Sequence, residues 1–191
     1  MRWLFIGDSI LDGMAPSIAS LYRSRRPRDS VTVLANSGWS TRRWLLDGQV
    51  ASRVADERPD VVVVALGTND EGEEGNAEGY GLVVDHLKAQ ASSRGAKVYW
   101  VTSFSGPGSA ERYQVIRGVL GDERTISGLA LMSGVEMAGE IHPSVVGYPT
   151  LAKHMLDAVW SRVVPSSHGG VFLPLAIGAV VAGVVLWWTE A

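Results

Sequence analysis

The chain has no cysteine among its 191 residues. Disulfides, thiolate catalysis and cysteine-ligated zinc or iron–sulfur sites are therefore excluded. There is no basic excess either: the formal net charge is −3, whereas nucleic-acid binding usually needs a strongly basic surface. No internal repeat is present, and no Gly-x-Gly-x-x-Gly or Gly-Lys-Ser/Thr phosphate loop follows the first apolar run. These absences argue against a nucleic-acid partner and against a nucleotide-binding domain.

The acidic, glycine-rich stretch 70–75 lacks the alternating spacing of calcium ligands. We interpret it as a solvated loop, and we expect neither a metal nor a cofactor. Residues 1–3 lead directly into an apolar run, which leaves no room for the parts of a secretory signal. We therefore predict no signal peptide.

Apolar runs alternate with segments of helical pattern along residues 1–163. The predicted strands are 1–9, 31–34, 61–66, 97–104 and 126–132, and helices are predicted over 10–22, from about 42, over 81–92, over 111–120 and up to 163. Such alternation predicts a parallel sheet with helices on both faces. We expect an α/β fold, a flavodoxin-like three-layer sandwich with a five-stranded parallel sheet, plus one C-terminal transmembrane helix.

Four short polar motifs occur in a fixed order: Gly7-Asp8-Ser9, Asn36-Ser37-Gly38, Gly67-Thr68-Asn69-Asp70 and Ile141-His142-Pro143. The first three close apolar runs. Because the carboxyl ends of parallel strands meet at one edge of a sheet, these motifs are expected to lie together where α/β proteins hold their sites. Serine, glycine, asparagine and histidine in this order resemble the SGNH (GDSL-type) hydrolases, and the likeness covers roughly residues 1–163.

The resemblance implies a role for each of the four residues. Ser9 would be the nucleophile and His142 the general base, while the backbone N–H groups of Ser9 and Gly38 and the side-chain amide of Asn69 would form the oxyanion hole. The residue types suit these roles. A serine between a strand and a helix lies near the positive end of the helix dipole, and histidine titrates near neutrality. Glycine lets a substrate approach the backbone closely.

The sequence departs from the family pattern beside the histidine. The family usually has an aspartate three residues before it, which orients the imidazole, but this chain has Gly139 there. Glu140, a backbone carbonyl or a water would have to take over this role, or the site is impaired. The other three histidines, His86, His154 and His168, are interpreted as surface or packing residues.

Several neighbours of the four motifs allow two interpretations. We expect Asp8 and Asp70 to be structural, with carboxylates that make turn hydrogen bonds. Trp39 either lines an acyl or sugar pocket or packs against the first helix. The arginines at 23, 25, 26 and 28 form either a solvated helix end, which we favour, or a basic patch that faces anionic lipid.

The C-terminal part of the chain differs in composition from the rest. We predict a hydrolase-like domain over 1–163, a flexible linker over 164–170 and a transmembrane helix over 171–188, because the last run is apolar and carries no charge. Lys153 and Arg162 precede this run, and Glu190 follows it. The positive-inside rule then predicts a single-pass C-terminal anchor with the hydrolase domain in the cytoplasm.

Small residues repeat at four-residue spacing within the apolar run: Gly178 with Ala182, and Ala179 with Gly183. Such pairs let two membrane helices pack closely, so a homo-oligomer formed through the anchor is one prediction. The expected function is a membrane-anchored serine esterase or lipase-type acyl hydrolase. Its substrate would be an acyl ester of a lipid or of a carbohydrate. The alternative is a catalytically impaired module of the same fold that binds or supports a partner at a membrane.

Overall fold

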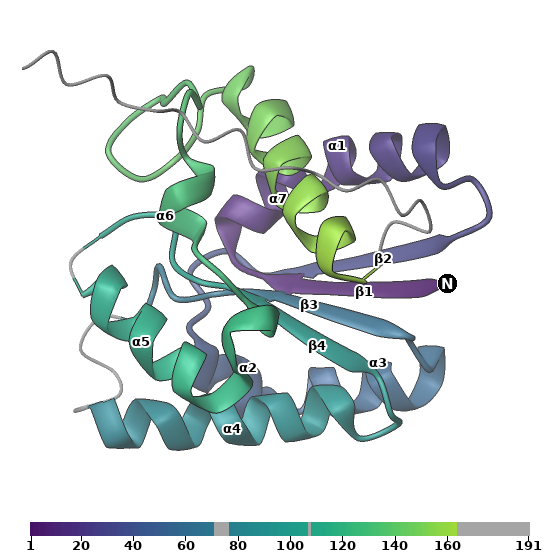
Figure 1. Ribbon diagram of the computed structural model, residues 1–191, viewed down its shortest axis with the longest axis vertical. Helices are drawn as coiled ribbons and strands as arrows, with labels where there is room; N and C mark the ends of the chain where they lie inside the picture. The colour runs from purple at the N-terminus through teal and green to yellow at the C-terminus, as the bar shows by residue number, and fades with distance from the viewer. Residues whose placement is uncertain (71–76, 107, 164–191) are drawn as a thin grey trace, which may run out of the picture.

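The computed structural model of the protein describes residues 1–70, 77–106 and 108–163. Its centre is one parallel sheet in the order β2-β1-β3-β4-β5 (Figure 1). The strands are β1 (Arg2–Gly7), β2 (Ser30–Ala35), β3 (Val61–Ala65), β4 (Lys97–Val101) and β5 (Thr125–Ile126). This is the flavodoxin-type strand order. The predicted α/β class and the five parallel strands are therefore confirmed.

Helices cover both faces of the sheet and complete three layers (Figure 1). One face carries α1 (Ser9–Arg25) and α7 (Gly147–Val163). The other carries α2 (Thr41–Asp47), α3 (Gln49–Glu57), α4 (Ala77–Ser92) and α5 (Ser109–Leu120). The short helix α6 (Gly128–Leu131) follows β5, which is itself preceded by a 3₁₀ turn, η1 (Asp122–Arg124).

Alternate residues of each central strand enter opposite halves of the core. In β1, Trp3 and Phe5 pack against α1 and α7, whereas Leu4 and Ile6 pack against the helices of the other face. All of β3 is fully buried, because helices cover it on both sides. This double coverage explains why its sequence is an unbroken β-branched run rather than an alternating one.

The prediction of a strand over 126–132 is wrong after its first residue. Ser127 instead caps α6, whose first residue is Gly128. A Cβ on Gly128 would lie 2.1 Å from the carbonyl oxygen of Thr102, so this glycine permits a close approach between α6 and the end of β4. A short apolar segment does not distinguish a strand from a helical turn by its pattern alone, and packing decided this one.

The predicted linker 164–170 and the predicted membrane segment 171–188 lie outside the described residues, as does most of the acidic loop 70–75. Among the helices of the described ranges, none is long and apolar enough to cross a membrane.

Candidate active site

The Gly-Asp-Ser motif forms the tight turn between β1 and α1. Gly7 ends the strand, and a Cβ there would lie 2.8 Å from the carbonyl oxygen of Ala65 on the neighbouring strand. Asp8 is the N-cap, and its Oδ1 accepts a hydrogen bond from the N–H of Ile10 at 3.0 Å. Ser9 is therefore the first residue of α1, where its N–H has no acceptor within the helix. The turn places the hydroxyl at the positive end of the α1 dipole.

Ser9 and His142 lie in direct contact although 133 residues separate them, with 2.9 Å between Ser9 Oγ and His142 Nε2. A short hairpin holds the histidine: the N–H of Ala138 donates to the carbonyl of His142 at 3.0 Å, and Met137 pairs with Pro143 in an antiparallel bridge. With the imidazole proton on Nδ1, Nε2 accepts from the serine hydroxyl. This is the contact that a nucleophile makes with its base.

Gly38 lies in the turn after β2 and has a φ of +74°. A Cβ at this position would meet nothing within 4 Å, so the backbone conformation rather than lack of space favours glycine here. Within the described part of the chain, no acceptor binds the N–H of Gly38. That N–H is available to a ligand.

The side chain of Asn69 joins two of the other motifs. Its Nδ2 donates to Asp8 Oδ2 at 3.3 Å and to the carbonyl of Trp39 at 3.3 Å. Asn69 thus lies between the turn that presents Ser9 and the turn that contains Gly38. The structure therefore brings together all four residues that the sequence singled out.

Two buried carboxylates support these turns. Asp70 accepts from the N–H of Thr41 at 2.7 Å, from Thr41 Oγ1 at 2.6 Å and from the hydroxyl of Tyr80 at 2.9 Å. Burial raises the pKa of Asp70, and it raises the pKa of Asp8 to about 6. Asp8 makes the predicted turn contact at Ile10, whereas Asp70 connects the third motif to the start of α2.

No group in the described ranges forms a hydrogen bond to Nδ1 of His142. Glu140, two residues before His142, is exposed and makes no such bond. Gly139 is exposed too, and a Cβ there would meet nothing within 4 Å. Within the residues that the structure describes, neither Glu140 nor a backbone carbonyl, two of the three groups expected to orient the ring, takes this role. The observed site is a serine–histidine pair.

The GDSL-like lipase/acylhydrolase family matches residues 5–148 of the chain. The protein belongs to this family. The matched region runs from β1 to the start of α7 and includes Ser9, Gly38, Asn69 and His142. Family membership makes the chain a GDSL-type esterase or acylhydrolase.

Several solved structures share the fold of this GDSL-type hydrolase. TesA is 20% identical with a TM-score of 0.67, over 85% of this chain and all of that one. The acetyl xylan esterase AlAXEase is 18% identical with a TM-score of 0.64, over 83% of this chain and all of that one. The psychrotrophic esterase EstA from Pseudoalteromonas sp., inhibited by monoethylphosphonate, is 14% identical with a TM-score of 0.68, over 83% and 96%. No curated protein sequence matches significantly.

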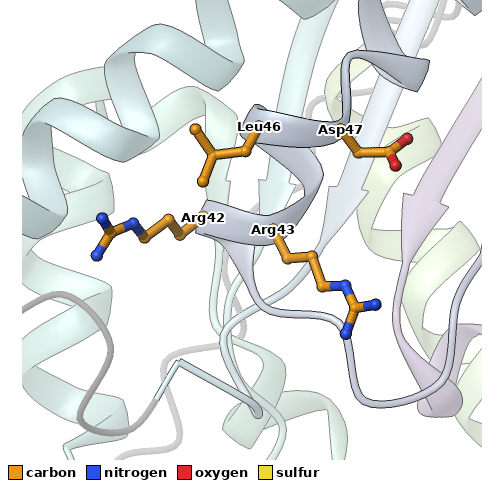
Figure 2. A pocket seen from close by; sticks show the side chains of 4 residues that line it. All are labelled: Arg42, Arg43, Leu46 and Asp47. Carbon is orange, nitrogen blue, oxygen red and sulfur yellow. The ribbon is translucent and has the colours of Figure 1, made fainter.

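Trp39 of this GDSL-type hydrolase packs against α2, so the predicted contact with the first helix is wrong. Its ring meets Trp44 edge to face, with 4.8 Å between centroids, and the Arg43 guanidinium lies 4.8 Å from its centroid. Figure 2 shows Arg43 beside Arg42 and Leu46 around a pocket on α2, with the two guanidinium groups pointing apart. Sequence reasoning missed this stack, because nothing local showed that the turn folds back onto α2.

His86 and His154 lie away from the site. His154 Nδ1 is 2.9 Å from the carbonyl oxygen of Leu131, which is a packing contact between α7 and α6. His86 is exposed on α4, and His168 lies outside the described residues.

Sequence reasoning also missed the contact between Asp8 and Asn69, for which the only signal was an acidic residue next to Ser9.

Proposed function

We propose that the protein is a serine hydrolase of carboxylic esters, with Ser9 as the nucleophile and His142 as the general base. The observation that carries the proposal is the 2.9 Å contact between Ser9 Oγ and His142 Nε2 at the amino end of α1. A serine hydroxyl is a weak nucleophile, and an adjacent base activates it. The fold of the site supplies that base and the positive end of a helix together.

The reaction that this arrangement supports has two halves. Ser9 Oγ attacks the ester carbonyl while His142 Nε2 takes the hydroxyl proton. The oxyanion that forms would accept hydrogen bonds from the N–H groups of Ser9 and Gly38 and from Asn69 Nδ2. His142 then gives its proton to the leaving alcohol, and an acyl-serine remains. In the second half a water attacks the acyl-serine and gives a proton to His142. His142 returns that proton to Ser9 Oγ as the bond between the acyl carbon and Oγ breaks, and the acid leaves.

The donors proposed for the oxyanion hole differ in the hydrogen bonds that they already make. The N–H of Gly38 is not used by any acceptor in the part of the chain that is described. Asn69 Nδ2 is engaged twice, but both bonds are 3.3 Å long, which is beyond the usual range for N–H···O. Turning one N–H of Asn69 toward an oxyanion would therefore sacrifice only a weak contact.

Hydrolysis of short and long p-nitrophenyl esters by the full-length protein tests the proposal. The variants Ser9→Ala and His142→Ala are expected to lower kcat by about 10³-fold or more, because each removes a member of the reacting pair. A fluorophosphonate should label the wild type and leave Ser9→Ala unlabelled. Equal rates in the wild type and Ser9→Ala, with no label on either, would contradict the proposal.

One observation favours a second candidate, a binding module of the same fold. No carboxylate orients His142 in the described ranges, and loss of an orienting carboxylate lowers turnover by about 10⁴-fold in a serine protease. In this case Ser9 and Gly38 would hold an ester or acid without cleaving it. A bound acyl ligand recovered unhydrolysed, from a protein that resists the fluorophosphonate, would identify the module.

We also propose that residues 171–188 anchor the protein in a membrane with the hydrolase domain in the cytoplasm. The support is the sequence: an uncharged apolar run long enough to cross a bilayer core. The full-length protein should stay in the membrane pellet after alkaline extraction. Ala182→Arg places a charge within the run, which costs about 3 kcal/mol at a helix centre, and should move protein to the supernatant. A wild type that is already in the supernatant contradicts the anchor.

The substrate class is part of the same proposal: an acyl ester of a lipid or of a carbohydrate. The shared fold with AlAXEase, described as an acetyl xylan esterase, supports the acylated carbohydrate. A comparison of acetylated oligosaccharides with lysophospholipids as substrates separates the two.

A further inference from the structure

The amino ends of β2, β1, β3 and β4 lie side by side at one edge of the sheet, opposite the proposed catalytic site. Adjacent backbones are joined there: the N–H of Asp60 donates to the carbonyl of Arg2 at 2.9 Å, and the N–H of Lys97 donates to the carbonyl of Asp60 at 3.0 Å. We name the segments 1–2, 23–30, 56–60 and 93–97 the amino edge. In Figure 1 this edge lies on the side of the labelled N-terminus.

The amino edge carries a concentration of positive charge. Its carboxylates are Asp29, Asp56, Glu57 and Asp60, against eight cationic side chains: Arg2, Arg23, Arg25, Arg26, Arg28, Arg58, Arg94 and Lys97. Three of the arginines are paired, Arg2 with Asp60, Arg25 with Asp157 and Arg26 with Asp29.

The other five cations of the amino edge, Arg23, Arg28, Arg58, Arg94 and Lys97, are exposed and form no ion pair within the described residues. Three of them, Arg58, Arg94 and Lys97, line one hollow beside the N-terminus. Arg58 lies between α3 and β3, Arg94 lies between α4 and β4, and Lys97 begins β4. Cations from two separate parts of the chain therefore face the same hollow.

The opposite edge has the reverse charge. We name the segments 8–12, 36–41, 67–70, 102–106 and 134–147, which surround Ser9, the catalytic edge. These segments contain no lysine or arginine. Their exposed carboxylates are Asp12, Glu136 and Glu140, while Asp8 and Asp70 are buried. Arg42 and Arg43 follow immediately, on α2. The two ends of the sheet therefore differ in the charge that they present to a surface.

The described chain also ends at the amino edge. Trp160, in the last turn of α7, donates through Nε1 to the hydroxyl of Tyr22 at 3.1 Å, and the Arg26 guanidinium lies 5.0 Å from its ring centroid. The end of α7 at Val163 thus lies beside the end of α1. From there seven residues, 164–170, lead to the apolar run at 171, and seven residues span at most about 25 Å.

We propose that the amino edge is a docking surface for an anionic lipid bilayer, so that the domain stands on the membrane with its catalytic edge away from it. The proposal rests on the membrane anchor proposed above. The short connection brings the amino edge to the headgroups, the unpaired cations attract anionic lipid there, and the acidic catalytic edge is repelled. No other face combines the chain exit with such a charge among the residues described.

This orientation restricts the substrate. β1 has six residues from the amino edge to the turn before Ser9, which at about 3.3 Å per residue separates Ser9 from the headgroups by roughly 20 Å. An ester embedded in the same bilayer does not reach that height. The substrate would therefore come from the aqueous side, as a soluble acylated molecule would.

Because the chain lacks cysteine, single fluorescent labels can report the orientation without competing sites. Ser93→Cys places a label at the amino edge and Val145→Cys places one at the catalytic edge; both positions are exposed. Full-length protein is reconstituted in phosphatidylcholine vesicles, with or without phosphatidylserine, that contain lipids with a nitroxide quencher on the headgroup. We expect strong quenching at 93 that depends on phosphatidylserine and weakens in high salt, and little quenching at 145.

Charge variants test the cause. Arg28→Gln, Arg94→Gln and Lys97→Gln together should reduce the phosphatidylserine-dependent quenching at 93 at least about threefold, because the attraction scales with the number of cations. The matched control Arg53→Gln, Lys88→Gln and Arg117→Gln removes the same charge from α3, α4 and α5 and should change it little. Neither set touches the proposed catalytic residues, so ester hydrolysis in detergent should be unchanged in both.

Each other outcome overturns the proposal in a recognisable way. Quenching at 145 equal to or greater than that at 93 refutes the orientation. Quenching at 93 that does not depend on phosphatidylserine refutes docking through anionic lipid. Both outcomes leave the anchor intact. Protein that remains in solution with both kinds of vesicle refutes the anchor, and the orientation with it.

Discussion

Asp8 and Asn69 are joined by a 3.3 Å hydrogen bond from Asn69 Nδ2 to Asp8 Oδ2, across 61 residues of sequence. The other oxygen of Asp8 caps α1 at Ile10. One buried carboxylate therefore fixes both the helix end that presents Ser9 and the amide proposed for the oxyanion hole. A change at Asp8 should alter stability and catalysis together.

Asp8→Asn is expected to flatten the dependence of stability on pH. Burial raises the pKa of Asp8 from 3.8 to about 6, so between these pH values the folded state binds more protons than the unfolded state. The free energy of unfolding then falls as pH rises from about 4 to about 6 and stays lower above, by roughly 3 kcal/mol from this group. Asparagine cannot titrate, so the variant should lose this decline.

Urea unfolding at about pH 4 and about pH 7 measures the effect. The comparison of interest is the change between the two pH values, which cancels any constant cost of the substitution. The variant amide also faces the Asn69 amide with a donor, so kcat for ester hydrolysis should fall as well. An identical pH dependence in wild type and Asp8→Asn would show that Asp8 does not titrate in this range.

Gly139→Asp is expected to raise the activity. His142 has no orienting carboxylate in the described residues, and position 139 is where the resemblance to the family places one. A Cβ at Gly139 meets nothing within 4 Å and its backbone is not left-handed, so an aspartate fits without strain. We expect kcat/KM for p-nitrophenyl esters to rise by about tenfold or more, within the 10⁴-fold that such a carboxylate can contribute.

The isosteric Gly139→Asn is the control, since it adds the same volume without the charge. Glu140→Gln should change kcat/KM by less than about threefold, because Glu140 makes no hydrogen bond to the ring. If Gly139→Asp is no more active than Gly139→Asn, then either the hairpin holds position 139 too far from Nδ1 or the ring is already well oriented.

Gly38→Ala is expected to reduce both stability and catalysis. The φ of +74° at Gly38 is unfavourable for alanine, at a cost of roughly 1 kcal/mol in the free energy of unfolding. Relaxation of that strain would turn the N–H away from the oxyanion, and loss of one such donor lowers kcat by about 10²-fold.

Gly48 offers a matched control for Gly38. Its φ is +78°, and a Cβ there also meets nothing within 4 Å, but it links α2 to α3. Gly48→Ala should lose a similar free energy of unfolding and keep its kcat. Equal kcat values for the two variants would remove Gly38 from the oxyanion hole.

Thr41→Val is expected to destabilise the fold in a way that grows with pH. The Thr41 hydroxyl donates to buried Asp70 at 2.6 Å, and a hydrogen bond to a charged group contributes about 1.5–3 kcal/mol. This bond lowers the pKa of Asp70 against the effect of burial. Because the bond favours the charged form of Asp70, its loss should cost more at about pH 7 than at about pH 4.

Thr41→Ser keeps the hydroxyl and removes one methyl group, which costs about 1 kcal/mol. Urea midpoints of both variants at the two pH values separate the hydroxyl from the methyl. The same loss in Thr41→Ser as in Thr41→Val would mean that packing, and not the bond to Asp70, holds this position.

Periodicity and turn chemistry predicted most of the architecture. The run 61–66 predicted a strand covered on both faces, and β3 is one. The prediction succeeded because burial on both faces favours an apolar residue at every position of the strand. The segment 126–132 was predicted wrongly, and so was one of the two positions considered for Trp39, the one against the first helix. In both places a short stretch near a strand end takes its conformation from what it packs against: α6 from Thr102, and Trp39 from Trp44.

The amino-acid sequence by itself determined which residues would meet at the carboxyl ends of the strands, because strand ends and turn residues are local signals and a parallel sheet gathers them at one edge. It also determined that position 139, where the family usually has an aspartate, carries no carboxylate. Only the tertiary structure decided that Ser9 and His142 lie within hydrogen-bonding distance, that Asn69 is held by Asp8, and that the cations collect opposite the site. These relationships join residues far apart in the sequence. Their distances depend on how the strands, α7 and the hairpin around His142 pack together.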